Sequence, residues 1–299
     1  MTFSPYTLSG HSFLGAGAEL SPGNWRFAVM AGRLKKAIEY NPLEHPNREP
    51  AYRRMGYAVK AGYEQGANAI SFTVFTAKDD QNSIRPSSLQ PQSNVATSIS
   101  GRTTLFSVIT LDAEYSLSVL NSDTRIYTVT ADSLGHFMSP SGLLEQTAAV
   151  RTFGAINAAI GYSASFWGIQ FRYERVAPDY KTLGAYFFNN DMENYTLAPN
   201  LRLLEEKLTI AANAGIQRNN LNRDREATSR RFAGSGTVSY APNEKINLSA
   251  SYSNFSAFTR NRPQLDPLPC FPYRRNHALT VKNPKNPNIR LPCCFGQWQ

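Results

Sequence analysis

The stretch Phe166–Val176 constrains the fold of this chain more than any other stretch, because its side chains alternate strictly in character. The large apolar residues of the alternation are Trp167, Ile169, Phe171 and Tyr173. The small, polar or charged residues between them are Gly168, Gln170, Arg172 and Glu174. A period of two indicates a β-strand with one apolar and one polar face. The length, about 9–11 residues, and the aromatic side chains near both ends are typical of a strand that crosses a bilayer at a tilt.

The same alternation recurs along the chain and predicts twelve strands. They are His11–Leu20, Trp25–Ile38, Ala51–Tyr63, Asn68–Ala77, Asn94–Ser100, Leu105–Val119, Ala149–Ile160, Phe166–Val176, Met192–Leu203, Leu208–Gln217, Arg231–Tyr240 and Ile246–Phe258. The connections between them alternate short and long, an asymmetry that is typical of outer-membrane barrels. We therefore expect an all-β fold, an antiparallel up-and-down transmembrane β-barrel with about twelve visible strands over residues 1–262.

Composition agrees with a barrel and excludes a helical membrane protein. No apolar run approaches the roughly 18 residues of a membrane-spanning helix. The net charge of +9 is concentrated near the end of the chain, where residues 270–299 hold five basic residues and no acidic one. Subtracting those five leaves +4 for the rest of the chain, so the charge does not indicate a nucleic-acid partner.

Residues 263–299 break the alternation and are predicted to be a tail that is either disordered or an artefact of the reading frame. This tail is rich in proline and holds all three cysteines, Cys270, Cys293 and Cys294. The predicted barrel therefore has no disulfide framework. Residues 1–10 lack the basic and apolar regions of a secretory signal. Because an outer-membrane protein needs such a signal, we expect the chain to be an internal fragment or to have a mispredicted start.

Several short motifs resemble a group of poorly characterised outer-membrane β-barrel proteins of Bacteroidota. The motifs are the stretch from Tyr173 to Tyr180, Leu183-Gly184, Tyr186–Asp191, Gln217–Leu221, Ser251–Phe255 and Arg54–Tyr57. The resemblance extends from about Phe13 to Pro263 and implies a bacterial outer-membrane location, without an established activity or catalytic residues. Barrels of this kind begin and end in the periplasm, whereas the first connection here is a short turn. We therefore expect at least one further strand at each end.

The predicted inner faces carry charged side chains that would line a barrel lumen. These lumen-facing candidates are Arg54, Lys60, Asp112, Glu114, Arg172 and Glu174. Such charges either tune which solutes pass or are a paired, hydrated lining, and we favour the lining. The inner faces as a whole consist of small, polar and charged residues, which suit a hydrated interior better than a dry core.

The predicted apolar faces carry aromatic residues near the strand ends, where a membrane interface would lie. They are Trp25, Tyr63, Tyr115, Trp167, Tyr173, Tyr195 and Tyr240. We favour an interfacial aromatic girdle for them over platforms that stack on sugars.

Catalytic and metal-binding patterns find little support in the sequence. The four histidines, His11, His45, His136 and His277, form no recognisable triad or dyad. The oxygen-rich stretch Asn189–Glu193 could hold Ca²⁺, but its spacing does not match an EF-hand and a polar loop is favoured. We therefore expect no enzyme activity, no cofactor and no metal.

The sequence leads to one favoured function and two alternatives. The favoured function is an outer-membrane β-barrel protein with passive solute passage or a structural, surface role, whose partners are outer-membrane lipid and small solutes. A soluble β-sandwich that binds a ligand is the first alternative, because a sandwich gives a similar alternation. An outer-membrane hydrolase built around His136 is the second.

Overall fold

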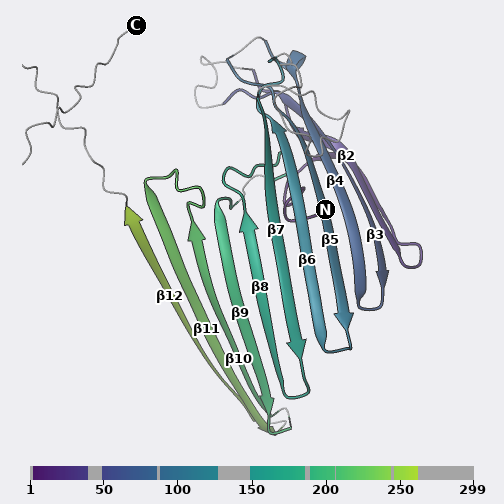
Figure 1. Cartoon of the computed structure of the whole chain (residues 1–299). Coiled ribbons are helices and arrows are strands. Elements are labelled where there is room, and N and C mark those ends of the chain that lie inside the picture. Colours follow the sequence, from purple (N-terminus) through teal and green to yellow (C-terminus); the bar gives the residue numbers. More distant parts are fainter. Residues whose placement is uncertain are drawn as a thin grey trace, which may run out of the picture. The chain divides into compact units, whose positions relative to one another are not determined.

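The structure is a computed structural model that describes residues 3–39, 49–85, 88–126, 149–185, 189–205, 207–243 and 246–261. Twelve strands form one antiparallel sheet in which every strand pairs with its neighbours in the sequence (Figure 1). The strands are β1 (Leu14–Leu20), β2 (Trp25–Lys35), β3 (Arg53–Gln65), β4 (Asn68–Asp80), β5 (Ser93–Leu105), β6 (Ile109–Asn121), β7 (Val150–Ser163), β8 (Trp167–Val176), β9 (Met192–Leu203), β10 (Leu208–Asn219), β11 (Ala227–Asn243) and β12 (Ile246–Asn261). The prediction of twelve antiparallel up-and-down strands is therefore confirmed.

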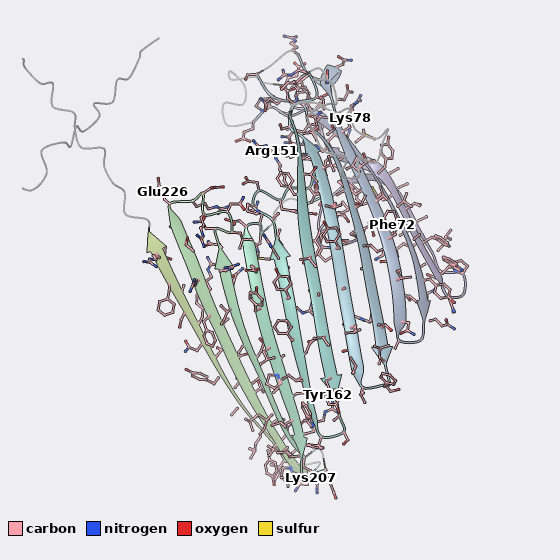
Figure 2. The ribbon with its side chains drawn as sticks, in the orientation of Figure 1. Phe72, Lys78, Arg151, Tyr162, Lys207 and Glu226 are labelled. Atoms are coloured by element: carbon pink, nitrogen blue, oxygen red, sulfur yellow. The ribbon has the colours of Figure 1, made fainter. Side chains whose placement is uncertain are left out.

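The connections divide between two edges of the sheet. At the turn edge the strands are joined by tight hairpins, and at the loop edge they are joined by the longer segments. Figure 2 shows Lys78 and Arg151 toward the loop edge and Tyr162 and Lys207 toward the turn edge. Within the described residues, the connection between β4 and β5 contains a short 3₁₀ turn, η1 (Gln81–Ser83). No helix within the described ranges has the length and apolarity needed to cross a membrane.

The two end strands each have one described partner. β1 pairs with β2 and β12 pairs with β11, and no pairing between β1 and β12 is found in the part of the chain that the structure describes. The structure thus establishes one continuous sheet with up-and-down topology.

The two faces of the sheet differ sharply, as the alternation predicts. One face, here called the apolar face, exposes large apolar side chains on strand after strand. Val59, Phe72 and Ile160 keep 53%, 51% and 50% of their surface exposed. The opposite face, here called the covered face, is partly overlaid by residues Phe3–Ser9, which we call the N-terminal insert. Large apolar groups are normally buried in a soluble fold, so their exposure in a continuous band sets this face of the sheet apart.

Most strand ends differ from their predicted positions by a few residues, and several strands continue into charged residues. β11 begins at Ala227 rather than Arg231, and β10 continues to Asn219. Ladder hydrogen bonds join backbone groups, so charged residues at the strand ends pair as well as apolar ones do. Other strands are shorter than predicted at one end. β1 begins only at Leu14, because the chain before it turns onto the covered face, and β2 ends at Lys35 and β6 begins at Ile109.

The turn between β5 and β6 lies a few residues beyond residues 101–104, which the predicted strands Asn94–Ser100 and Leu105–Val119 leave for it. Gly101 belongs to β5, where it pairs with Ala113, so the prediction of a turn there is wrong. The turn is formed instead by Phe106 and Ser107, which adopt positive φ angles of 52° and 59°. Glycine favours such conformations and indicates a turn in sequence, whereas Phe106 and Ser107 carry no comparable signal. The predicted tail, residues 263–299 with its three cysteines, lies outside the described residues.

Candidate functional site

The covered face brings together all six predicted lumen-facing residues. Arg54, Lys60, Asp112, Glu114, Arg172 and Glu174 occupy alternate positions of β3, β6 and β8 on that face. The register pairs Glu114 with Ser100 and with Asn157, which also pairs with Glu174. Because cross-strand partners point to the same side of a sheet, these charges share one surface. Their placement follows directly from the alternation in the sequence.

The N-terminal insert lies against these charges and is bonded to them. The Ser4 hydroxyl donates a hydrogen bond to Glu114, and the Tyr6 phenol donates one of 2.8 Å to Glu174. Lys60 donates from Nζ to the Phe3 carbonyl oxygen at 3.1 Å. Burial, together with the bond to Glu174, raises the pKa of the Tyr6 phenol, so it stays protonated as a donor. Three predicted lumen charges therefore position the chain's own N-terminal segment.

The loop between β8 and β9 holds the insert from its other side. The Tyr180 phenol donates to the Tyr6 carbonyl at 2.7 Å, and the Thr182 hydroxyl donates to the Thr7 carbonyl at 2.8 Å. The Ser9 amide donates to the Gly184 carbonyl at 3.1 Å, and Leu8 forms a parallel bridge with Gly184. A Cβ atom on Gly184 would lie 2.4 Å from the Thr7 carbonyl oxygen, so this approach requires glycine.

Asn94 on β5 ties that loop to the sheet. Its side-chain oxygen accepts the Leu183 amide at 3.0 Å, and its side-chain nitrogen donates to the Ser118 hydroxyl at 2.8 Å. Ser118 in turn donates to the Lys181 carbonyl at 2.7 Å. Asn94 and Ser118 are fully buried, and a buried polar group is costly unless it is bonded. These bonds fix the loop, and through it the insert, in one position.

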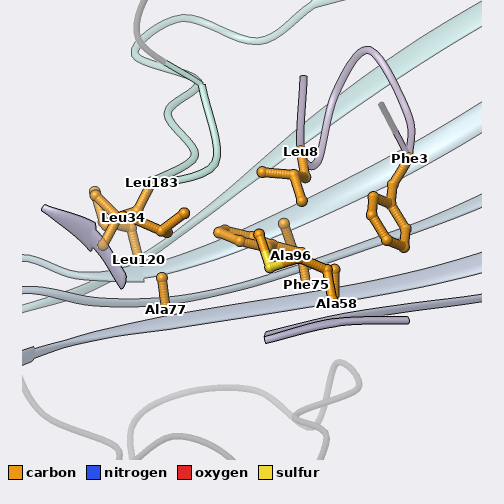
Figure 3. Packing of buried hydrophobic residues seen from close by; sticks show 10 residues of the cluster. Phe3, Leu8, Leu34, Ala58, Phe75, Ala77, Ala96, Leu120 and Leu183 are labelled. Atoms are coloured by element: carbon orange, nitrogen blue, oxygen red, sulfur yellow. The ribbon is translucent and has the colours of Figure 1, made fainter. Parts of the chain in front are cut away.

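An apolar cluster under the insert makes part of the covered face dry. Figure 3 shows Phe3 and Leu8 of the insert beside Ala58, Phe75 and Ala96 of the sheet. Phe75 is completely buried although it occupies the polar side of the alternation in β4. The expectation of a hydrated interior throughout is therefore wrong for this part, because the insert supplies apolar partners that the strand pattern could not show. An aromatic residue at a polar-face position was the available signal.

A polar cavity of about 350 Å³ lies on the covered face beside the insert. Its charged lining comprises four basic and three acidic residues: Arg26, Lys60, Arg102, Arg172, Glu64, Asp112 and Glu114. Arg26 pairs with Glu64 at 3.1 Å, Arg102 pairs with Asp112, and Arg172 donates to the Asn157 side-chain oxygen at 3.3 Å. The lining is therefore largely paired, as a hydrated wall is expected to be.

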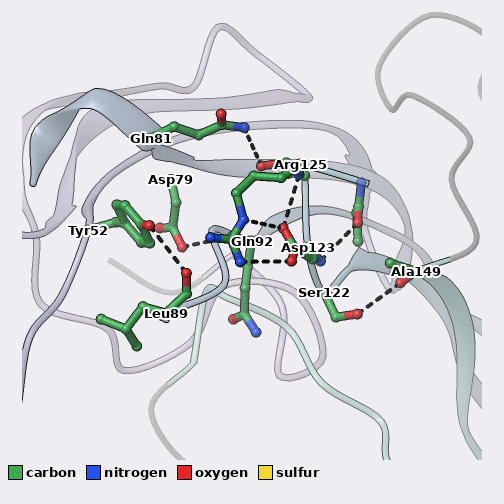
Figure 4. A network of polar contacts seen from close by, with 11 residues as sticks. Tyr52, Asp79, Gln81, Leu89, Gln92, Ser122, Asp123, Arg125 and Ala149 are labelled. Carbon is green, nitrogen blue, oxygen red and sulfur yellow. Dashed lines mark hydrogen bonds and ion pairs between the residues drawn. The ribbon is translucent and has the colours of Figure 1, made fainter. Parts of the chain in front are cut away.

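The last predicted lumen residue, Arg54, has a structural partner. It donates two hydrogen bonds, of 2.7 and 2.9 Å, to the carboxylate of Asp79, which is buried. The same carboxylate accepts the Gln92 amide at 3.0 Å, which fixes the connection between β4 and β5 (Figure 4). Nearby, Arg125 donates to Asp123 and lowers the pKa of that carboxyl. These bonds stabilise the described parts of the loops at the loop edge.

The predicted interface aromatics all lie on the apolar face, but they are not all near strand ends. Trp25 and Tyr63 pack edge to face at 5.2 Å near the turn edge. The ring centres of Tyr173 and Tyr195 lie 5.1 Å apart, and this pair is nearer the loop edge. Tyr115, however, is the seventh of the thirteen residues of β6 and lies in the middle of the strand. Trp167 begins β8, and Tyr240 lies close to the turn edge of β11.

The described residues bring together no group of three or more His, Cys, Asp or Glu side chains that could hold a metal. In the stretch considered for Ca²⁺, Asp191 pairs with Arg225 at 2.9 Å and accepts the Leu221 amide at 2.8 Å. Glu193 pairs with Arg218. His45, His136 and His277, and with them the site of the hydrolase alternative, lie outside the described residues. No protein-family model matches the chain, and no curated protein matches it either.

Proposed function

We propose that this chain forms the wall of a bacterial outer-membrane β-barrel whose role is structural or surface-directed, with its interior narrowed by its own N-terminal insert. The observation that carries the proposal is the division between the two faces. Exposed apolar side chains cover one face across the sheet, while the insert and the charges that line the polar cavity lie on the other. A barrel wall needs this division, because lipid contacts one face and an enclosed interior contacts the other.

The division also favours a barrel wall over a soluble β-sandwich. A sandwich buries the apolar face of one sheet against a second sheet about 10 Å away. The described residues form one sheet, and its apolar face carries side chains such as Trp25 and Tyr57 that are about half exposed. In water, that surface would promote aggregation, whereas hydrocarbon would cover it fully.

Solute passage is the second candidate, and the polar cavity favours it. Its paired charges and its volume of about 350 Å³ suit hydration and small polar solutes. The insert, however, is held by hydrogen bonds on both sides, and those from the loop between β8 and β9 are buried. A segment fixed in this way narrows the path for a solute. We therefore place the structural role first.

Reconstitution tests both the location and the role. The full chain is folded with phosphatidylcholine vesicles that contain a trapped small dye. We expect the chain to float with the vesicles, to resist extraction by urea, and to release little dye. A chain that stays in the aqueous fraction without detergent would contradict the membrane location. Rapid release of the dye by the unaltered chain would favour solute passage over the structural role.

A further inference from the structure

Four charged residues form a row across adjacent strands at the loop edge of the apolar face. Arg175 on β8 pairs with Glu193 on β9, Glu193 pairs with Arg218 on β10, and Arg218 pairs with Arg230 on β11. We call these four residues the arginine row. Adjacent strands lie about 4.8 Å apart, so the backbone positions of the three arginines lie within about 15 Å of one another.

The row lies directly beside the apolar band of the same strands. Two positions toward the turn edge, the cross-strand partners are Tyr173, Tyr195, Ile216 and Phe232. Side chains two residues apart in a strand share a face, so the guanidinium groups and the aromatic band face the same medium. Toward the turn edge, the same face of these strands carries Trp167, Leu201, Leu208 and Tyr240, which are uncharged. The cations are thus confined to one border of the band.

The row has an excess of positive charge. Glu193 is buried, accepts a hydrogen bond from Arg218, and accepts another of 2.9 Å from the Tyr173 phenol. Arg175 and Arg230 are exposed, and neither forms an ion pair with a residue that the structure describes. Three guanidinium groups and one carboxylate give the row a net charge of about +2 at neutral pH. Glu193 positions Arg218 without neutralising the whole row.

We propose that the arginine row binds the phosphate groups of anionic lipids in the leaflet next to the loop edge. The inference deepens the proposed function and rests on it, because the row meets a headgroup layer only if the aromatic band lies in hydrocarbon. The planar guanidinium fork matches two phosphate oxygens at once. A cation near an anionic membrane surface contributes on the order of 1 kcal/mol, which corresponds to about a fivefold preference per arginine.

The test measures lipid selectivity at the protein surface. The full chain is reconstituted in phosphatidylcholine bilayers with trace spin-labelled phosphatidylglycerol or spin-labelled phosphatidylcholine, and the motionally restricted fraction of each label is measured. We expect the unaltered chain to prefer phosphatidylglycerol. In the double variant Arg175→Gln with Arg230→Gln, the selectivity for phosphatidylglycerol over phosphatidylcholine should be lower by roughly tenfold or more.

A matched control uses two exposed arginines on the covered face of the same part of the sheet. The double variant Arg202→Gln with Arg231→Gln removes the same charge but should leave the preference unchanged. The preference of the unaltered chain should also fall as salt is added, because salt screens exposed charges. Equal preferences in the unaltered chain and the Arg175/Arg230 variant would overturn the inference alone. Failure of the chain to enter the bilayer would overturn the proposed function as well.

Discussion

Replacing Phe171 with arginine tests the assignment of the apolar face most sharply. Phe171 is the fifth of the ten residues of β8, so in a spanning strand it lies near the bilayer midplane. It is 40% exposed, and its ring lies 6.4 Å from that of Tyr195. Arginine at the midplane of a transmembrane strand costs about 2–4 kcal/mol. The lost aromatic contact adds about 0.5–1.5 kcal/mol. We therefore expect Phe171→Arg to destabilise the inserted state by roughly 3–5 kcal/mol.

The neighbouring residue supplies the control. Gln170 lies on the covered face, where its cross-strand partners are Gly161 and Ala198 and leave room for a longer side chain. Gln170→Arg should change the stability by less than about 1 kcal/mol. Both variants are compared by guanidinium titration of vesicle-inserted protein, followed by tryptophan fluorescence. Equal destabilisation by the two substitutions, or a larger effect at Gln170, would refute the assignment of the faces.

Three further predictions concern the covered face and the loop edge. Gly184→Ala places a Cβ atom 2.4 Å from the Thr7 carbonyl oxygen, so we expect faster hydrogen exchange at the Ser9 amide. The control Gly101→Ala places its Cβ atom 3.9 Å from the nearest atom and should leave that exchange rate unchanged. Asp79→Asn leaves the largely buried Arg54 without its countercharge and should cost about 3 kcal/mol in denaturant titration. Asp80→Asn, at the more exposed neighbouring pair with Arg53, should destabilise the chain much less, and equal costs would contradict the argument. The hydrogen bond from Arg125 lowers the pKa of Asp123, so its stabilisation is present above the ordinary carboxyl pKa of about 3.9 and is lost as the pH falls through the lower folded value. Because Arg125 is partly exposed, the stability difference between the unaltered chain and Asp123→Asn should be below about 1 kcal/mol at pH 7 and should vanish in acid.

The strands could be predicted because their signal is local. Alternation fixes which face each residue occupies, and so the sequence alone places Lys60, Glu114 and Glu174 on one surface. The two edges of the sheet could also be predicted, because connection length alternates along the chain. These features need only the sequence of each strand and of its nearest neighbours.

The N-terminal insert could not be predicted, because its position depends on contacts far away in the sequence. Tyr6 is bonded to Glu174 and Tyr180, which follow it by 168 and 174 residues. A segment as short as Phe3–Ser9 has no periodicity that could reveal such partners. Its aromatic and aliphatic residues, outside any strand, were the only indication that it packs somewhere.

The arginine row could not be predicted for a different reason. The hydrophobic pattern assigns the charge-rich residues 218–230 to a loop, which separates Arg218 and Arg230 from the strands that carry them. Their direct pairing across β10 and β11 follows only when the register is known. Charged residues at strand ends are poorly assigned by hydrophobic patterns, although in a membrane-spanning sheet these are the positions where charge meets the headgroups.

Nitroxide accessibility along β8 is the measurement that tests the central claim most directly. In a background with Cys270, Cys293 and Cys294 replaced by serine, single spin labels are placed in turn at residues 168–175 of the vesicle-inserted chain. Collisions with oxygen, which concentrates in hydrocarbon, should peak at 169, 171 and 173, and collisions with a water-soluble nickel chelate should not peak there. A profile without period two, or strong nickel accessibility at 171, would contradict a lipid-facing sheet.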